Sequence, residues 1–138
     1  TYSAGIAHFN GWGAAAADVD DDGDVDLVAH RLFRNDSATG NHYLQVKLTG
    51  GATPEQTEGL SNRDAIGAVV KAEVGGSLIL RQVEGGKGVG CQNSSVLHFG
   101  LGAADKVDTL SVIWPSGKTS NLTDISGDQL LELAEPLD

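Results

Sequence analysis

The stretch ADVDDDGDVDL at residues 17–27 is the most informative part of the chain. Aspartate occupies every second position from Asp18 to Asp26, and Asp21 fills one of the gaps. Carboxylates this close together repel one another strongly unless a cation lies among them. Ca²⁺ binds about 6–8 oxygen ligands at short range, and Gly23 allows the sharp turn that such a loop needs. The stretch therefore predicts a calcium-binding loop.

The alternation also predicts which atoms bind the metal. The expected ligands are the side-chain oxygens of Asp18, Asp20 and Asp22, the backbone carbonyl of Asp24 and the carboxylate of Asp26. An EF-hand or dockerin loop would need an acidic residue at its twelfth position, which is Ala29 here. The loop closes instead at its ninth position, with Asp26. The alternative is a solvated acidic loop that binds no metal.

The residues around the loop predict short strands. Residues 14–17 are too few to sustain a helix and are expected to form a strand, with residues 25–34 as its partner across the loop. Further strands are predicted at residues 42–48, 66–74, 77–84, 95–100, 107–114, 119–122 and 129–134. A two-residue hairpin turn is expected at Gly75 and Gly76, an irregular strand at 85–91, and turns at 101–106 and 124–128.

The number and spacing of these segments define the fold class. Roughly eight or nine short strands separated by turns are typical of a β-sandwich or barrel. The 19 glycines and the lack of an amphipathic helix longer than two turns agree with this. We therefore predict an all-β protein: an antiparallel β-sandwich or barrel-like domain with an N-terminal calcium-loop β-hairpin.

Composition excludes several classes of partner. A net charge of −10 argues against nucleic acid and anionic membrane surfaces, and no apolar run approaches the roughly 18 residues of a membrane helix. The single cysteine, Cys91, cannot form a disulfide within the chain and is expected to be a small buried residue. The chain begins at Thr1 and not at methionine, so we expect a fragment of a longer protein.

The acidic loop and five later motifs resemble known families. The spacing D-x-D-x-D-G-x-x-D resembles the calcium loop of FG-GAP (VCBS) repeats, which form the blades of integrin-α-type β-propellers. The later motifs, in order, are NRDAIGA at 62–68, GGKG at 85–88, HFGLG at 98–102, WPSG at 114–117 and LELAEP at 131–136. Together they resemble the ASPIC/UnbV domain, which commonly follows FG-GAP repeats in secreted or surface proteins such as the cartilage acidic protein family.

This resemblance implies a division of the chain into two domains. Residues 1–40 would form a single FG-GAP-like calcium-loop hairpin packed on the main domain, and residues 41–138 an ASPIC/UnbV-like β-sandwich. A single repeat cannot close a propeller, because each blade needs neighbours to bury its faces. The resemblance implies no established biochemical activity.

Motifs of catalytic sites are missing from the sequence. The four histidines, His8, His30, His42 and His98, do not recur at the spacing of zinc ligands. There is no G-x-S-x-G nucleophile elbow, and the glycines at 85–90 do not match a phosphate-binding loop. We expect that the protein is not an enzyme.

The expected function is a non-enzymatic calcium-binding extracellular module for adhesion or protein interaction, secreted or held at the cell surface. Ca²⁺ would be structural, and the partner would be a protein or a glycan at the cell surface or in the matrix. The alternative is a carbohydrate-binding module with structural calcium. For that alternative Trp12 is the expected ligand-binding residue, since Trp114 ends an alternating segment and is expected to be buried. The sequence predicts no oligomeric state.

Overall fold

The computed structural model describes residues 13–37 and 39–137. These residues form ten β-strands and no helix, so no helix long and apolar enough to cross a membrane is found among them. The described chain divides into two compact units. The N-terminal unit contains residues 13–37 and 86–94, and the C-terminal unit contains residues 39–85 and 95–137. The all-β class predicted from the sequence is confirmed.

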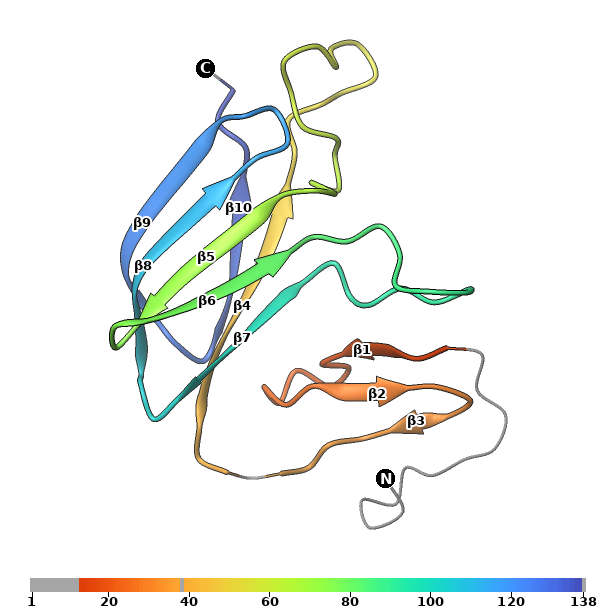
Figure 1. The fold of residues 1–138 in the computed structure, drawn as a ribbon, viewed down its shortest axis with the longest axis vertical. Coiled ribbons are helices and arrows are strands. Elements are labelled where there is room, and N and C mark those ends of the chain that lie inside the picture. Colours follow the sequence, from red (N-terminus) through yellow and green to blue (C-terminus); the bar gives the residue numbers. More distant parts are fainter. Residues whose placement is uncertain (1–12, 38, 138) are drawn as a thin grey trace. The chain divides into compact units, whose positions relative to one another are not determined.

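The N-terminal unit is built on a three-stranded antiparallel sheet. Its strands β1 (Ala15–Ala17), β2 (Asp26–Val28) and β3 (Leu32–Phe33) lie in the order β1-β2-β3 (Figure 1). The aspartate loop joins β1 to β2, and Ala17 pairs with Asp26 at its base. The single strand predicted over residues 25–34 is wrong, because the chain turns back between β2 and β3, where Ala29 N–H donates to the Arg31 carbonyl at 3.0 Å.

A distant segment completes the N-terminal sheet. Residues 86–94, from the connection between the sixth and seventh strands, lie along β1. Ser94 N–H donates to the Ala16 carbonyl at 3.0 Å, and Ala16 N–H donates to Asn93 Oδ1 at 3.0 Å. The irregular strand predicted at 85–91 is reduced to one bridge between Gly88 and Cys91. The predicted division at residue 40 stays a prediction, and these contacts assign a later segment to the N-terminal unit.

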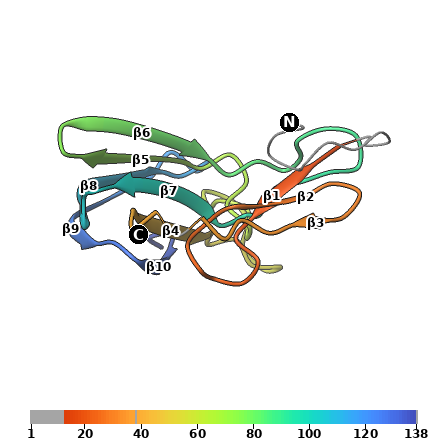
Figure 2. The same cartoon turned by 90° about the horizontal axis from the view of Figure 1, so that it is seen from below.

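The C-terminal unit is a two-layered β-sandwich. Figure 2 shows β5 and β6 in one layer and β4 and β10 in the other. The three-stranded sheet has the order β10-β4-β7 and the four-stranded sheet the order β6-β5-β8-β9, with no closed barrel among the described strands. The bounds are β4 (His42–Thr49), β5 (Val69–Val74), β6 (Ser77–Gln82), β7 (Leu97–Gly102), β8 (Lys106–Ile113), β9 (Thr119–Ser126) and β10 (Gln129–Ala134).

The core lies between the two sheets and follows from the alternation of side chains. Alternate residues of β5 are buried, and in β4 the alternating Leu44, Val46 and Leu48 are buried together with Gln45. The fully buried large side chains include Leu44, Val46, Val70, Phe99, Leu110 and Val112. Trp114 is only 1% exposed, and its Nε1 donates to Ser120 Oγ at 2.9 Å. The predicted burial of Trp114 is therefore confirmed.

One strand pair departs from the antiparallel pattern. β10 runs parallel to β4, with Leu131 beside Val46, whereas the other strand pairs are antiparallel. β9 continues to Ser126, beyond the predicted end at residue 122, and β7 continues to Gly102. The turns predicted at 101–106 and 124–128 are therefore wrong at their first residues. In each case pairing with a neighbouring strand extends the element past the local turn signal.

A turn at residues 62–68 delays the start of β5. The Asn62 side chain binds both backbone groups of Ile66: its Nδ2 donates to the Ile66 carbonyl and its Oδ1 accepts from Ile66 N–H, each at 2.9 Å. Ala65 is fully buried within this turn and has a φ of 51°. β5 therefore begins at Val69, three residues later than predicted.

Candidate metal centre

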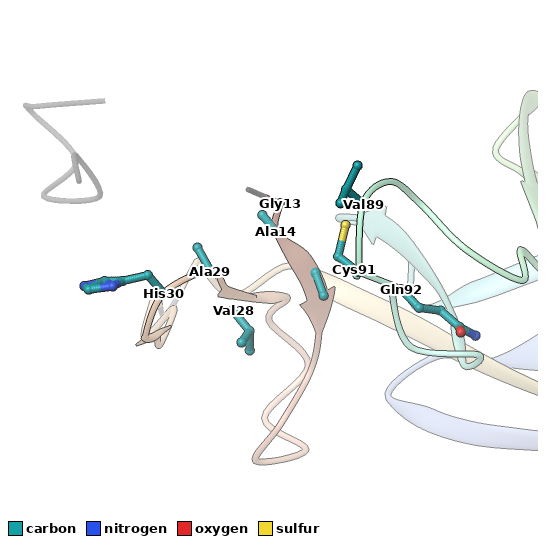
Figure 3. A pocket seen from close by; sticks show the side chains of 10 residues that line it. Gly13, Ala14, Val28, Ala29, His30, Val89, Cys91 and Gln92 are labelled. Atoms are coloured by element: carbon teal, nitrogen blue, oxygen red, sulfur yellow. The ribbon is translucent and has the colours of Figure 1, made fainter. Parts of the chain in front are cut away.

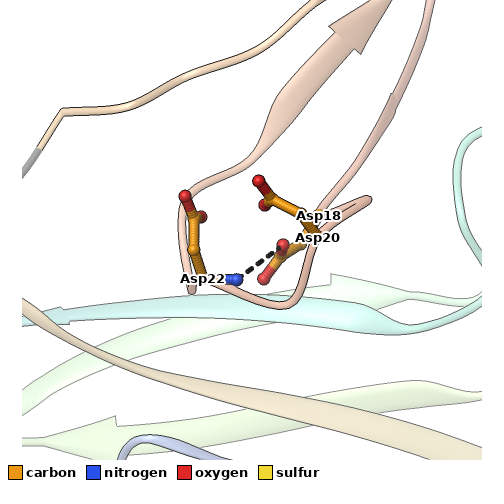
Figure 4. A group of neighbouring side chains, drawn as sticks. All are labelled: Asp18, Asp20 and Asp22. Atoms are coloured by element: carbon orange, nitrogen blue, oxygen red, sulfur yellow. Dashed lines mark hydrogen bonds between the residues drawn. The ribbon is translucent and has the colours of Figure 1, made fainter.

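Three of the predicted ligands lie together in the loop between β1 and β2. Asp18, Asp20 and Asp22 each offer a carboxylate oxygen, and these atoms all lie within 4.8 Å of one another (Figure 4). The side chains come from alternate positions of one tight loop, as the sequence spacing predicts. Asp18 is half-buried, and Asp20 and Asp22 are exposed.

Hydrogen bonds within the loop hold these carboxylates in place. Asp18 accepts from Asp22 N–H at 3.2 Å through Oδ1 and from Gly23 N–H at 2.9 Å through Oδ2. Asp22 Oδ1 accepts from Asp24 N–H at 2.9 Å. The turn requires positive φ at Gly23, whose φ is 91°, and at Asp21, whose φ is 58°. Hydrogen bonds to backbone N–H groups of the same loop therefore hold the carboxylates of Asp18 and Asp22 toward the loop's own backbone.

Asp26 has a different position from the other predicted ligands. It is 1% exposed, and each of its oxygens accepts a backbone N–H, from Asn35 at 2.7 Å and from Val19 at 2.9 Å. The Asn35 N–H, followed by the Val19 N–H, lowers the pKa of Asp26 below its usual value. Asp26 thus ties the first part of the loop, at Val19, and the segment after β3, at Asn35, to the start of β2. The predicted ligand roles of the Asp24 carbonyl and the Asp26 carboxylate stay predictions.

The position of Asp26 leads to a prediction about the scaffold. Asp26→Asn would turn an amide group toward one of two backbone N–H donors and leave that donor without an acceptor. We expect the variant to lower the melting temperature of the N-terminal unit already in EDTA, where a ligand role cannot contribute. A loss confined to the Ca²⁺ buffer would contradict a scaffold role and would favour Asp26 as a ligand.

A cation that was not predicted from the sequence lies against the cluster. Arg34, directly after β3, places its Nε 2.8 Å from Asp20 Oδ2 and 2.5 Å from Asp36 Oδ1, and its Nη2 3.9 Å from Asp22 Oδ2. The Asp20 carboxylate, followed by that of Asp36, raises the pKa of Arg34. Desolvation within the loop raises the pKa of Asp20, and the charge of Arg34 opposes this rise. The position of Arg34 depends on the turn between β2 and β3, which the sequence did not reveal.

The donor set fits a calcium ion. Ligand oxygens lie about 2.3–2.6 Å from Ca²⁺, so two ligands of one ion are separated by at most about 5 Å. The carboxylate oxygens of Asp18, Asp20 and Asp22 meet this condition. They are hard, negatively charged donors, and the exposure of two of these residues leaves access for water as additional ligands.

A separate cavity of about 390 Å³ lies in the N-terminal unit (Figure 3). It lies between β1 and β2 on one side and the 89–92 segment on the other, and Cys91 contributes to its lining. Figure 3 shows the imidazole of His30 pointing away from Cys91, so the two do not form a metal site. Cys91 is half-buried, which corrects the expectation that it is a small buried residue.

The remaining sequence candidates have structural contacts or lie outside the described residues. His42 Nδ1 lies 2.7 Å from Asp128 Oδ2, and this bond lowers the pKa of Asp128. The His98 ring stacks on Tyr43, with ring centroids 5.7 Å apart. Trp12, the predicted glycan-binding residue, lies outside the described residues, as does His8.

A buried carboxylate in the C-terminal unit was also missed. Glu135, directly after β10, is 3% exposed. Its Oε2 accepts from Gly51 N–H and from Ser61 N–H, each at 2.8 Å, and its Oε1 accepts from the hydroxyls of Ser61 and Ser116. These bonds outweigh desolvation and lower the pKa of Glu135 to about 2. The four donors satisfy the carboxylate, so it ties the β4–β5 loop and the β8–β9 turn to the segment after β10 rather than forming a reactive site.

Comparison with known proteins places the chain in a family. Residues 58–137 match the family described as "ASPIC and UnbV". The chain is 30% identical over 139 aligned residues to "Cartilage acidic protein 1" of Homo sapiens and, over the same length, to that of Mus musculus; the alignments cover 93% of this chain. The Xenopus tropicalis protein of the same name is 30% identical over 137 residues, or 91% of the chain. The chain spans only 20% of the length of these relatives. The match to the family covers more than half of the chain, which therefore belongs to the ASPIC and UnbV family.

Proposed function

We propose that this chain is a non-enzymatic calcium-binding module of an extracellular protein, with Ca²⁺ bound in the loop between β1 and β2. The observation that supports this most directly is the approach of three carboxylates from Asp18, Asp20 and Asp22 to within 4.8 Å of one another. Without a cation of high charge, this arrangement places three negative charges in one turn of chain.

Ca²⁺ in this loop would have a structural role. Asp18, Asp20 and Asp22 would bind it through side-chain oxygens, with the Asp24 carbonyl and Asp26 as the further ligands expected from the spacing. The ion would neutralise the carboxylates and fix the loop that joins β1 to β2. Its dissociation constant should be on the order of 10⁻⁴–10⁻³ M, as in extracellular modules, so that the site is filled outside cells and empty in the cytosol.

The loop and the sheet around it also support the finer assignment to an FG-GAP-like repeat. The D-x-D-x-D-G-x-x-D spacing lies across an antiparallel pair of strands, as the resemblance implies. An extracellular location is supported by the similarity to proteins whose name refers to cartilage. On this basis the partner is a protein or a glycan at the cell surface or in the matrix.

A carbohydrate-binding module is the weaker alternative. Of the two tryptophans that could form an aromatic platform, Trp114 is buried in the core at 1% exposure, as expected. Trp12 is therefore the only tryptophan left for such a platform. A glycan array without hits, together with unchanged tryptophan fluorescence on addition of glycans, would remove this alternative.

Replacement of one central ligand tests the calcium role. Asp22→Asn keeps the oxygen that accepts from Asp24 N–H but removes one of the three clustered charges. We expect the variant to lose most of the increase in melting temperature that Ca²⁺ gives the wild type, and to melt close to the wild type in EDTA.

Asp64→Asn is the matched control, because it removes one exposed carboxylate from the C-terminal unit. It should keep the full response to Ca²⁺. If Asp22→Asn and Asp64→Asn responded to Ca²⁺ equally, the loop would not be the calcium site.

A further inference from the structure

Arg34 pairs with carboxylates that are proposed calcium ligands, so the arginine and a metal ion would compete for the same oxygens. Its guanidinium lies 2.8 Å from Asp20 Oδ2 and 3.9 Å from Asp22 Oδ2, so it contacts two of the three clustered carboxylates. The Arg34 side chain is 55% exposed, and the Asp20 and Asp22 side chains are 26% and 32% exposed. A positive charge supplied by the chain itself therefore neutralises part of the cluster.

The geometry makes this arginine unfavourable for a bound divalent ion. An ion among the three carboxylates would lie within about 5 Å of any group that contacts Asp20 and Asp22, because its ligands are about 2.3–2.6 Å away. A guanidinium stays protonated in proteins, so its repulsion of the ion cannot be relieved by loss of a proton. Solvent exposure reduces this repulsion without removing it.

Asp36 is a further ion-pair partner of Arg34. Arg34 Nε lies 2.5 Å from Asp36 Oδ1, and the Asp36 side chain is 66% exposed, which places this carboxylate at the open side of the cluster. When Asp20 and Asp22 turn to an ion, the guanidinium can remain paired with Asp36. The loop thus has two ways of balancing its charge: by Arg34 alone, or by the ion with Arg34 held by Asp36.

We propose that Arg34 is a built-in counter-ion that competes with Ca²⁺ for Asp20 and Asp22 and so sets the calcium affinity of the loop. This inference rests on the proposed function. Arg34 stabilises the metal-free loop and raises the dissociation constant for Ca²⁺, while Asp36 draws Arg34 away and lowers it. The site is thereby tuned to respond at high, extracellular concentrations of calcium rather than to hold the ion permanently.

Calorimetric titration of CaCl₂ into the 138-residue chain, freed of metal by a chelating resin, tests this. Arg34→Gln should lower the dissociation constant about threefold to tenfold, in line with the worth of a partly screened charge pair. In EDTA the same variant should melt at a lower temperature than the wild type, because its carboxylates lose their counter-ion. Arg34→Lys keeps the charge and should bind Ca²⁺ nearly as the wild type does.

Two further variants separate local contact from total charge. Arg31→Gln removes the same charge three residues away, where the guanidinium lies over the Phe33 ring at 4.9 Å, and should change the dissociation constant by much less than Arg34→Gln. Asp36→Asn should raise the dissociation constant when Arg34 is present. In the Arg34→Gln background its effect should largely vanish, since neighbouring residues that act through one contact are not additive.

The outcomes distinguish the inference from the proposed function. If the wild type binds Ca²⁺ and Arg34→Gln binds it equally or more weakly, Arg34 is not a competitor and the inference fails while the calcium site stands. A weaker Arg34→Gln would identify Arg34 as a group that orients Asp20 for the ion. If neither protein binds Ca²⁺ up to 10 mM, which is about ten times the largest dissociation constant expected, both proposals fail.

Discussion

Replacement of Gly50 by alanine is expected to prevent the C-terminal unit from folding stably. A Cβ atom at this position would lie 2.0 Å from the Asn62 carbonyl oxygen and 2.6 Å from that of Ser61. Neither carbonyl can move away easily, because Gly50 N–H donates to the Arg63 carbonyl at 2.9 Å and Ala52 N–H donates to the Ser61 carbonyl at 3.0 Å. The loss should reach or exceed about 3 kcal/mol, the upper end of ordinary overpacking, since backbone atoms and not side chains clash.

Chemical denaturation followed by tryptophan fluorescence measures this loss, because Trp114 is buried in the same unit. Gly100→Ala is the matched control: Gly100 lies in β7, and a Cβ there would meet nothing within 4 Å. We expect this control to differ from the wild type by no more than about 1 kcal/mol, as a glycine-to-alanine change in a strand does. A Gly50→Ala variant as stable as the control would show that the 50–62 loop is not packed as described.

Removal of the Glu135 carboxylate should have the second largest effect. Glu135→Ala leaves the N–H groups of Gly51 and Ser61 and two serine hydroxyls without their acceptor in a buried site. We expect a loss of about 3 kcal/mol or more, since hydrogen bonds to charged groups contribute about 1.5–3 kcal/mol each and buried unsatisfied donors are costly. Glu135→Gln should lose less, because its amide oxygen can accept the two N–H groups while its NH₂ faces the hydroxyls, which can accept.

The same carboxylate predicts how stability depends on pH. The pKa of Glu135 falls from the ordinary 4.5 to about 2 in the folded chain. A group whose folded pKa is lowered stabilises the fold fully above its unfolded pKa and loses that contribution as the pH falls through the folded pKa. The stabilisation by Glu135 is therefore complete above about pH 5 and is lost between pH 4.5 and pH 2.

Urea denaturation at a series of pH values measures this dependence. The free energy of unfolding of the wild type should fall more steeply below pH 4.5 than that of Glu135→Gln, which has no carboxylate to protonate at this position. Parallel curves for the two proteins over this range would show that Glu135 does not carry the lowered pKa.

The parts of the site that are local in sequence could be predicted from it. Asp18, Asp20 and Asp22 come together because alternate residues of one tight loop project to the same side, and Gly23 permits the turn. The hairpin across the loop follows from the same stretch. The alternation of residues 42–48 similarly predicted β4 and its buried face. In each case the residues that determine the loop or strand lie within it or within a few positions of it.

The features that were not predicted from the sequence depend on contacts between residues far apart in the chain. Arg34 reaches the aspartates only because the chain turns back between β2 and β3, which local propensity did not indicate. Asn93 bonds to Ala16 across 77 positions, and Glu135 bonds to Ser61 across 74. No periodicity in the sequence encodes which residues meet at such separations. The parallel pairing of β10 with β4 was missed for the same reason.

The melting temperature of the 138-residue chain in EDTA, in 10 mM Ca²⁺ and in 10 mM Mg²⁺ tests the calcium site most directly. At this concentration, with a dissociation constant on the order of 10⁻⁴–10⁻³ M, Ca²⁺ should stabilise the folded chain by about 1.4–2.7 kcal/mol through mass action. We predict a clear rise in Ca²⁺ and a much smaller one in Mg²⁺, which requires octahedral geometry and gives up its water reluctantly. Identical melting in all three buffers would contradict calcium binding and would leave the aspartate stretch as a solvated loop neutralised in part by Arg34.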